Sequence, residues 1–162
     1  MVAEPVSARP ALPPAMKVVV AYFILLFVAI IGMQTTTVID YEFARSLGFQ
    51  EDDPASADRF VAGRARLERA TALADVIIQG LLGLGAIIGL LKRRGFGLAC
   101  GFGLLAISVY WPTFDMFNEA VLGRTGFGEG LIPAHVIIES VIIVTALAAA
   151  LTLYRHRRLF VN

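Results

Sequence analysis

The sequence predicts an all-α integral membrane protein, a bundle of four transmembrane helices with a helical extracytoplasmic segment between the first two. Apolar residues make up 57% of the 162 residues and charged residues only 17%, whereas soluble domains carry about 25% charged residues. The apolar residues also gather in four runs, each close to the roughly 20 residues that a helix needs to cross about 30 Å of hydrocarbon. In addition, basic residues collect at one end of these runs, as expected for a multi-pass protein.

The runs define one membrane domain, residues 16–158. Residues 1–15 contain four prolines and are expected to form a disordered lead-in, and residues 159–162 form a short tail. The first run is longer than the apolar core of a signal peptide and no A-x-A site follows it, so we expect a retained helix. Transmembrane helices are expected at about 16–39, 70–91, 95–116 and 131–154.

The charged segment of residues 40–69 is predicted to be helical in two parts. Phe43, Ala44 and Leu47 share one helical face, and Gly48 is expected to end that helix. Asp53-Pro54 has the pattern of an N-cap followed by proline at the first helical position. From there a helical pattern continues into the second transmembrane helix, which we therefore expect to extend beyond the bilayer.

Small residues recur at helix-packing spacing in the second and third runs. Gly85 and Gly89, and likewise Gly97 and Gly101, are four residues apart, which lets helix backbones approach closely in lipid. The favoured interpretation is a tight hairpin of these two helices, and a homodimer interface is the alternative. Cys100 is the only cysteine, so an internal disulfide is excluded.

The distribution of basic residues predicts the orientation. Eight of them flank the two termini and the turn between the second and third helices, where Glu4 is the only acid: Arg9, Lys17, Lys92, Arg93, Arg94, Arg155, Arg157 and Arg158. Since cytoplasmic segments carry an excess of Lys and Arg, both termini are expected in the cytoplasm of a cell with the protein in its inner (plasma) membrane.

Polar residues of all four helices converge on the opposite, outer half of the bilayer. The candidate ligand-binding residues are Gln34, Thr37, Gln79, Tyr110, Trp111 and Asp115, and the candidate catalytic residues are His135, Glu139 and Asp75. His135 and Glu139 are one helical turn apart, as are Asp75 and Gln79, so each pair shares a helix face. Glu139 lies about 12 Å inside the outer edge.

These polar residues favour a shared pocket. Ionisable side chains inside a membrane are costly and usually face the bundle interior. Glu139 is expected to be protonated, bonded to His135, or paired with an arginine from residues 64, 66 or 69. His135 and Glu139 are then a candidate acid/base couple, and the alternative is that Asp75, Asp115 and His135 only cap or anchor helix ends.

Metal and haem sites are not favoured. His135 is the one strong nitrogen ligand near the acids, and no zinc-type spacing occurs. The two histidines, His135 and His156, lie about 31 Å apart along one helix, which excludes them as the two axial ligands of one haem. The sequence predicts no metal and leaves the cofactor unknown.

Two families show resemblances. The stretch Ile78-Gln79-Gly80-Leu81-Leu82-Gly83-Leu84-Gly85, followed by a basic turn and a second glycine-rich helix, resembles the central hairpin of DoxX-like proteins. This resemblance implies a small four-helix membrane subunit linked to redox or stress functions.

The second resemblance is to the sterol-isomerase and sigma-2-receptor-like superfamily, through Asp75 with Gln79 and through His135 with Glu139. In its isomerases such a pair acts on a sterol-like substrate within the membrane. Here the His–Glu pair is on the fourth helix, not on the helix where those isomerases carry it.

The leading functional prediction is an accessory or binding subunit, more consistent with a non-enzyme, that packs in a larger membrane assembly or homo-oligomer. The expected partners are membrane lipids, other membrane subunits and a hydrophobic small molecule, with no role for nucleic acid. One alternative is an intramembrane enzyme or a lipid-, quinone- or sterol-binding protein that uses His135 and Glu139. The second alternative is a small transporter, which the apolar inner half disfavours.

Overall fold

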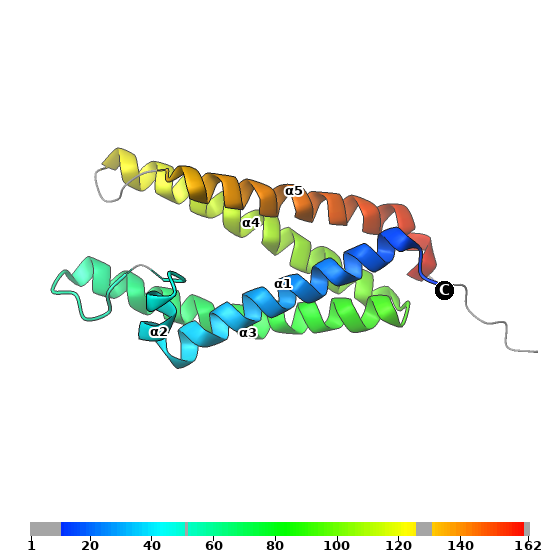
Figure 1. Cartoon of the computed structure of the whole chain (residues 1–162), viewed down its shortest axis with the longest axis horizontal. Helices are drawn as coiled ribbons and strands as arrows, with labels where there is room; N and C mark the ends of the chain where they lie inside the picture. The colour runs from blue at the N-terminus through cyan, green and yellow to red at the C-terminus, as the bar shows by residue number, and fades with distance from the viewer. Residues whose placement is uncertain (1–10, 51, 126–130, 161–162) are drawn as a thin grey trace, which may run out of the picture.

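The computed structural model describes residues 11–50, 52–125 and 131–160, with the side chain of Thr125 left out (Figure 1). Within these ranges every regular element is helical. Most of the predicted lead-in, part of the glycine-rich loop before the last helix and the last two residues of the tail lie outside the described residues.

Four of the helices are long and apolar enough to cross a membrane, namely α1, α3, α4 and α5, which confirms the predicted all-helical fold with four candidate membrane spans. The elements are α1 (Pro14–Ile39), α2 (Tyr41–Ser46), α3 (Arg59–Leu91), α4 (Gly95–Thr125), α5 (Pro133–His156) and the 3₁₀-helix η1 (Arg157–Phe160). Prolines occupy the first turns of α1 and α5, where a missing N–H costs nothing.

The predicted helix start at Asp53-Pro54 is wrong, because α3 begins at Arg59. The Asp58 carboxylate caps α3 by accepting a 2.8 Å hydrogen bond from the Phe60 N–H. Asp53 closes a turn instead, accepting from the Ala55 N–H at 2.8 Å and pairing with Arg45 at 3.0 Å. Both contacts lower the pKa of Asp53, and the hydrogen bond from the Ala55 N–H has the larger effect.

Two helices are longer than the hydrocarbon layer requires. At 1.5 Å per residue, the 33 residues of α3 span about 50 Å and the 31 residues of α4 about 46 Å. The expectation that the second membrane helix begins well before residue 70 is confirmed. The expected end of the third helix near residue 116 is too early. Pro112 removes one backbone hydrogen bond, but α4 continues past it to Thr125.

The four long helices form a V (Figure 1). The α1–α3 pair and the α4–α5 pair meet at the end where α5 and η1 finish, and they diverge toward α2. The apolar core fills the closed end. It consists of Met16, Val19, Val20, Phe23, Ala86, Leu90, Leu98, Leu104, Leu105, Ala146, Ala149, Leu153 and Phe160.

Glycines bring α3 and α4 together at this closed end. A Cβ added to Gly89 would lie 2.3 Å from the Gly97 Cα, and one added to Gly85 would lie 2.7 Å from the Cys100 Sγ. A Cβ on Gly101 would meet Leu153 and Phe23 of α5 and α1. These glycines thus serve packing within the chain, which confirms the predicted hairpin.

At the open end, α2 closes over the α1–α3 pair. Gly48 follows α2 with a φ of 75°, a conformation that glycine adopts readily, so the predicted end of this helix is confirmed. The Tyr41 hydroxyl contacts the Glu68 carboxylate and donates to the Asp52 carbonyl at 3.3 Å. The pKa of the Tyr41 hydroxyl is raised, mainly by burial and secondly by the contact with Glu68.

Candidate functional site

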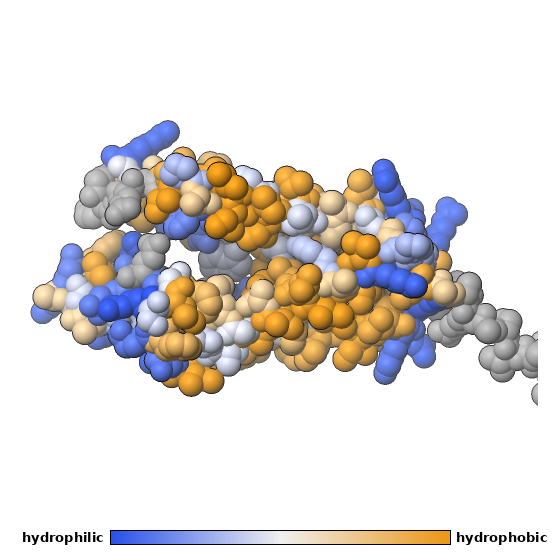
Figure 2. Space-filling model, in the orientation of Figure 1, coloured by the Kyte–Doolittle hydropathy of each residue, from blue (hydrophilic) through white to orange (hydrophobic). Residues whose placement is uncertain are grey.

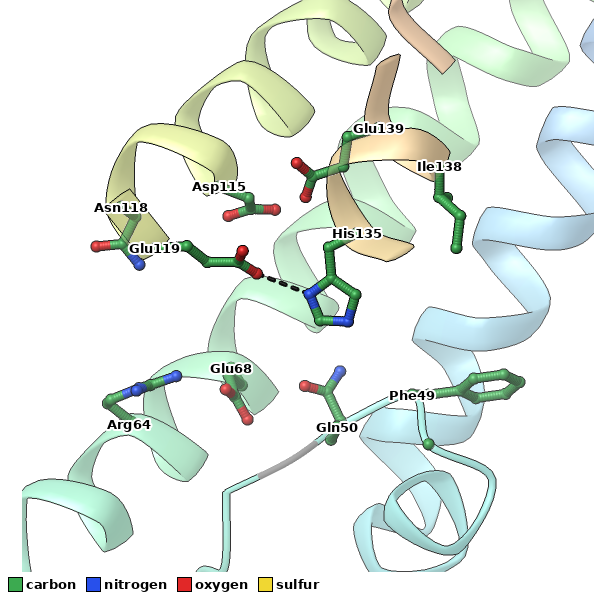
Figure 3. Close-up of a pocket in the computed structure, with 11 residues that line it drawn as sticks. Phe49, Gln50, Arg64, Glu68, Asp115, Asn118, Glu119, His135, Ile138 and Glu139 are labelled. Atoms are coloured by element: carbon green, nitrogen blue, oxygen red, sulfur yellow. Dashed lines mark hydrogen bonds and ion pairs between the residues drawn. The ribbon is translucent and has the colours of Figure 1, made fainter. Parts of the chain in front are cut away.

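The two diverging helix pairs enclose an open pocket of about 340 Å³. Figure 2 shows the molecule hollowed between its two halves on the side away from the closed end. The lining residues come from the α2–α3 connection, α3, α4 and α5: Gly48, Phe49, Gln50, Arg64, Glu68, Asp115, Asn118, Glu119, His135, Ile138 and Glu139 (Figure 3).

The connection after α2 is held against the pocket by polar contacts. The Gln50 side-chain amide donates to the Thr37 hydroxyl at 3.2 Å, and that hydroxyl bonds the Met33 carbonyl. Thr37 is fully buried. This candidate residue therefore supports the pocket wall from behind, and Gln50 is the residue that reaches the pocket.

The central contact of the pocket joins α4 to α5. His135 Nδ1 lies 2.7 Å from a carboxylate oxygen of Glu119, and the other oxygen of Glu119 accepts from the Ile132 N–H at 3.4 Å. Glu119 thus both orients the imidazole and caps the start of α5. Sequence reasoning missed Glu119 because it ended the third helix near residue 116, although Asp115 and Glu119 are one turn apart and face the same side.

Glu139 lines the same pocket, one turn further along α5 (Figure 3). Its Oε2 is buried and has no hydrogen-bond partner among the described residues. Two of the arginines considered as partners are engaged elsewhere: Arg64 pairs with Asp52 at 2.9 Å, and Arg69 donates to the Val38 carbonyl at 2.7 Å. His135, which was one of the alternatives considered for Glu139, pairs with Glu119.

The structure corrects the predicted grouping of Asp75 with His135 and Glu139. Asp75 is not among the lining residues of the pocket, because it faces α1 and accepts a 3.3 Å hydrogen bond from Gln34. Gln79, one turn further on, is buried against apolar side chains of α1 and α4. Gln34 and Asp75 therefore form a polar contact between α1 and α3 that is separate from the pocket.

The aromatic candidates of α4 lie on its outer face. Tyr110 is 61% exposed, and its ring stacks on Phe114 and meets Trp111 edge-on. Such a cluster suits the membrane interface, where aromatic rings gather. Neither Tyr110 nor Trp111 lines the pocket, whereas Asp115 does.

The pocket offers hydrogen-bond acceptors, and most of its lining side chains are polar or charged. It holds four carboxyl groups, those of Glu68, Asp115, Glu119 and Glu139, against Arg64 and His135. No three His, Cys, Asp or Glu side chains within residues 11–50, 52–125 and 131–160 are placed to hold a metal ion together. Because of its four carboxyl groups, the pocket suits ligands that carry hydrogen-bond donors or a positive charge.

No known protein family, curated protein or solved structure matches this chain. The resemblances to DoxX-like and sterol-isomerase-like proteins stay predictions.

Proposed function

We propose that this protein is a small membrane-embedded binding subunit that packs in a larger assembly or homo-oligomer and receives a partner in the pocket between its two helix pairs. The observation that carries this proposal is the buried Glu139 Oε2, which lacks a hydrogen-bond partner among the described residues of an open pocket. A buried acceptor left unsatisfied costs about 1–3 kcal/mol. A partner that donates to Glu139 would recover that free energy on binding.

The shape and charge of the pocket support this assignment. Its volume of about 340 Å³ falls in the range of small-molecule sites, about 300–1,000 Å³. Its carboxyl groups outnumber its basic side chains, so an amine, a hydroxyl or an amide fits better than an anion. The favoured ligand is an amphipathic molecule or a partner segment that presents such a group between the helix pairs.

We further propose that both termini lie in the cytoplasm and that the pocket opens outward from the inner (plasma) membrane. The support is the concentration of basic residues at the closed end and of acids around the pocket. An enzymatic reporter fused after Asn162 that works only outside the cytoplasm should therefore stay inactive.

Site-specific photocrosslinking in native membranes tests the binding function. A photoreactive residue at Ile138, which is 58% exposed and lines the pocket, should give a discrete adduct, whereas one at Val144, 63% exposed and outside the pocket, should not. Glu139→Leu should abolish the Ile138 adduct, and Glu139→Gln should weaken it less. Glu42→Gln, the same change outside the pocket, should leave it unchanged.

The mass of the adduct separates the kinds of partner. A protein adduct supports an assembly subunit, and a lipid, sterol or quinone adduct supports the small-molecule alternative. An adduct that forms equally from Ile138 and Val144, or that ignores Glu139→Leu, contradicts the proposal.

A second candidate function, acid/base catalysis on a hydrophobic substrate, is favoured by the 2.7 Å contact of His135 with Glu119. A carboxylate that orients an imidazole is a common arrangement for a general base. This candidate function requires that the purified protein chemically convert the small molecule identified by crosslinking. His135→Ala should stop that conversion.

Transport finds less support. Met16, Phe23, Leu90 and Leu153 are fully buried at the closed end of the V, so a path through the bundle would require this core to open.

A further inference from the structure

Basic side chains crowd the closed end of the bundle, opposite the pocket. We define the basic end by its seven residues: Lys17, Lys92, Arg93, Arg94, Arg155, Arg157 and Arg158. They come from the start of α1, the α3–α4 turn, and the junction of α5 with η1. The described residues of these three segments include no acid, and the ion pairs between described residues lie toward the other end.

Phe160 fixes these segments into one surface. Its side chain is only 2% exposed and belongs to the apolar core, although it is close to the end of the sequence. Its carbonyl oxygen lies 3.4 Å from the position of a Cβ on Gly95. The 3₁₀-helix η1 therefore folds back beneath the α3–α4 turn, and the basic side chains of η1 come next to those of residues 92–94.

The basic end also has an aromatic anchor. The Arg157 guanidinium lies 4.0 Å from the centroid of the Tyr154 ring and donates to the Tyr154 carbonyl at 2.9 Å. Tyr154 is 55% exposed. Exposed tyrosines at a helix end lie at the level of lipid headgroups, so the neighbouring arginines are positioned where phosphates lie.

We propose that the basic end is a binding site for the headgroups of anionic phospholipids. Five of its side chains are exposed: Lys17, Lys92, Arg94, Arg155 and Arg158. A lipid with net negative charge attracts these five exposed basic side chains, whereas the ammonium group of a zwitterionic lipid repels them. Each basic residue near a charged membrane surface strengthens anionic lipid binding by about 1 kcal/mol, or about fivefold. This site lies opposite the pocket and does not depend on the proposed function.

The test compares retention of dioleoylphosphatidylglycerol and dioleoylphosphatidylcholine by the full-length protein in detergent, measured by native mass spectrometry. The wild type should retain the anionic lipid in preference. The double variants Lys92→Gln/Arg94→Gln and Arg155→Gln/Arg158→Gln should each lower the ratio of bound anionic to zwitterionic lipid by at least about fivefold. Raising the salt to about 0.5 M should lower that ratio for the wild type.

The matched control is Arg59→Gln/Arg66→Gln, which removes the same charge from exposed positions at the other end of the molecule. It should keep the wild-type ratio. Equal retention of the two lipids by the wild type, or an equal loss in the control, overturns the proposal. The midpoint of thermal unfolding in phosphatidylcholine should be the same for all variants, which separates lost lipid binding from misfolding. If a variant misfolds, the salt dependence of the lipid ratio for the wild type still tests the proposal.

Discussion

The contact between Gly89 and Gly97 leads to a quantitative prediction for the Gly89→Ala variant. The added Cβ would lie 2.3 Å from the Gly97 Cα and 2.6 Å from its nitrogen, about 1.1 Å short of the 3.4 Å at which ordinary contact begins. Both atoms belong to the backbone, so relief requires α3 and α4 to separate. Overpacking of this kind costs about 1–3 kcal/mol.

A helical alanine is itself about 1 kcal/mol more favourable than glycine, and this gain opposes the clash. The clash is expected to win, because two helix backbones cannot yield as a flexible side chain can. Gly89→Ala should therefore lower the midpoint of thermal unfolding in detergent.

Gly103→Ala is the matched control, since its Cβ would meet only the Leu82 side chain at an ordinary 3.5 Å. It should unfold at or above the wild-type temperature. If Gly89→Ala is as stable as Gly103→Ala, the inferred close approach of α3 and α4 is refuted.

Three further predictions concern the ends of the bundle. The contacts of Asp53, which include the pair with Arg45, lower its pKa, so their stabilisation of the α2–α3 connection is present above the unfolded-state pKa of Asp53. This stabilisation is lost as pH falls through the folded-state pKa, and the rate of proteolysis in the connection should then rise. Asp53→Asn should remove this pH dependence. Glu119→Gln should weaken the contact between residue 119 and the His135 imidazole by about 1 kcal/mol and accelerate amide hydrogen exchange at the start of α5. Phe160→Ala should cost about 3 kcal/mol of unfolding free energy, measured in the same thermal assay.

Neighbouring or equivalent residues supply the controls. Glu42→Gln, at an exposed position of α2, should not change amide exchange in α5. Leu159→Ala, at a position 36% exposed, should cost much less than the loss of the adjacent buried ring. A cost for Leu159→Ala as large as that for Phe160→Ala would show that η1 is not anchored as described, and exchange in α5 that ignores Glu119→Gln would remove its capping role.

The helices were predictable because their signals are local and strong. Four long apolar runs can only satisfy their backbone groups in lipid as helices, and Gly48 marked an end that the structure confirms. The start of α3 was misplaced because Asp53 and Asp58 are both good caps. The pairing of Asp53 with Arg45, which no local pattern reveals, leaves Asp58 as the cap.

The site was predictable only in part. Depth along a helix correctly brought His135, Glu139 and Asp115 to one pocket. Depth does not give the rotation of a helix, and Asp75 turns toward Gln34 on α1. Glu119 was missed because the apolar pattern ends before α4 does. A residue past the expected end of the helix could not be assigned a depth in the bilayer.

Cysteine accessibility can show whether the chain is a multi-pass membrane protein whose pocket opens on the side opposite its closed end. In a Cys100→Ala background, a single cysteine at Asn118 samples the pocket and one at Arg158 samples the basic end. A membrane-impermeant maleimide added to intact cells should label the Asn118→Cys variant, and it should label Arg158→Cys only after the membrane is opened. Labelling of both variants, or of Arg158→Cys alone, in intact cells would contradict the account.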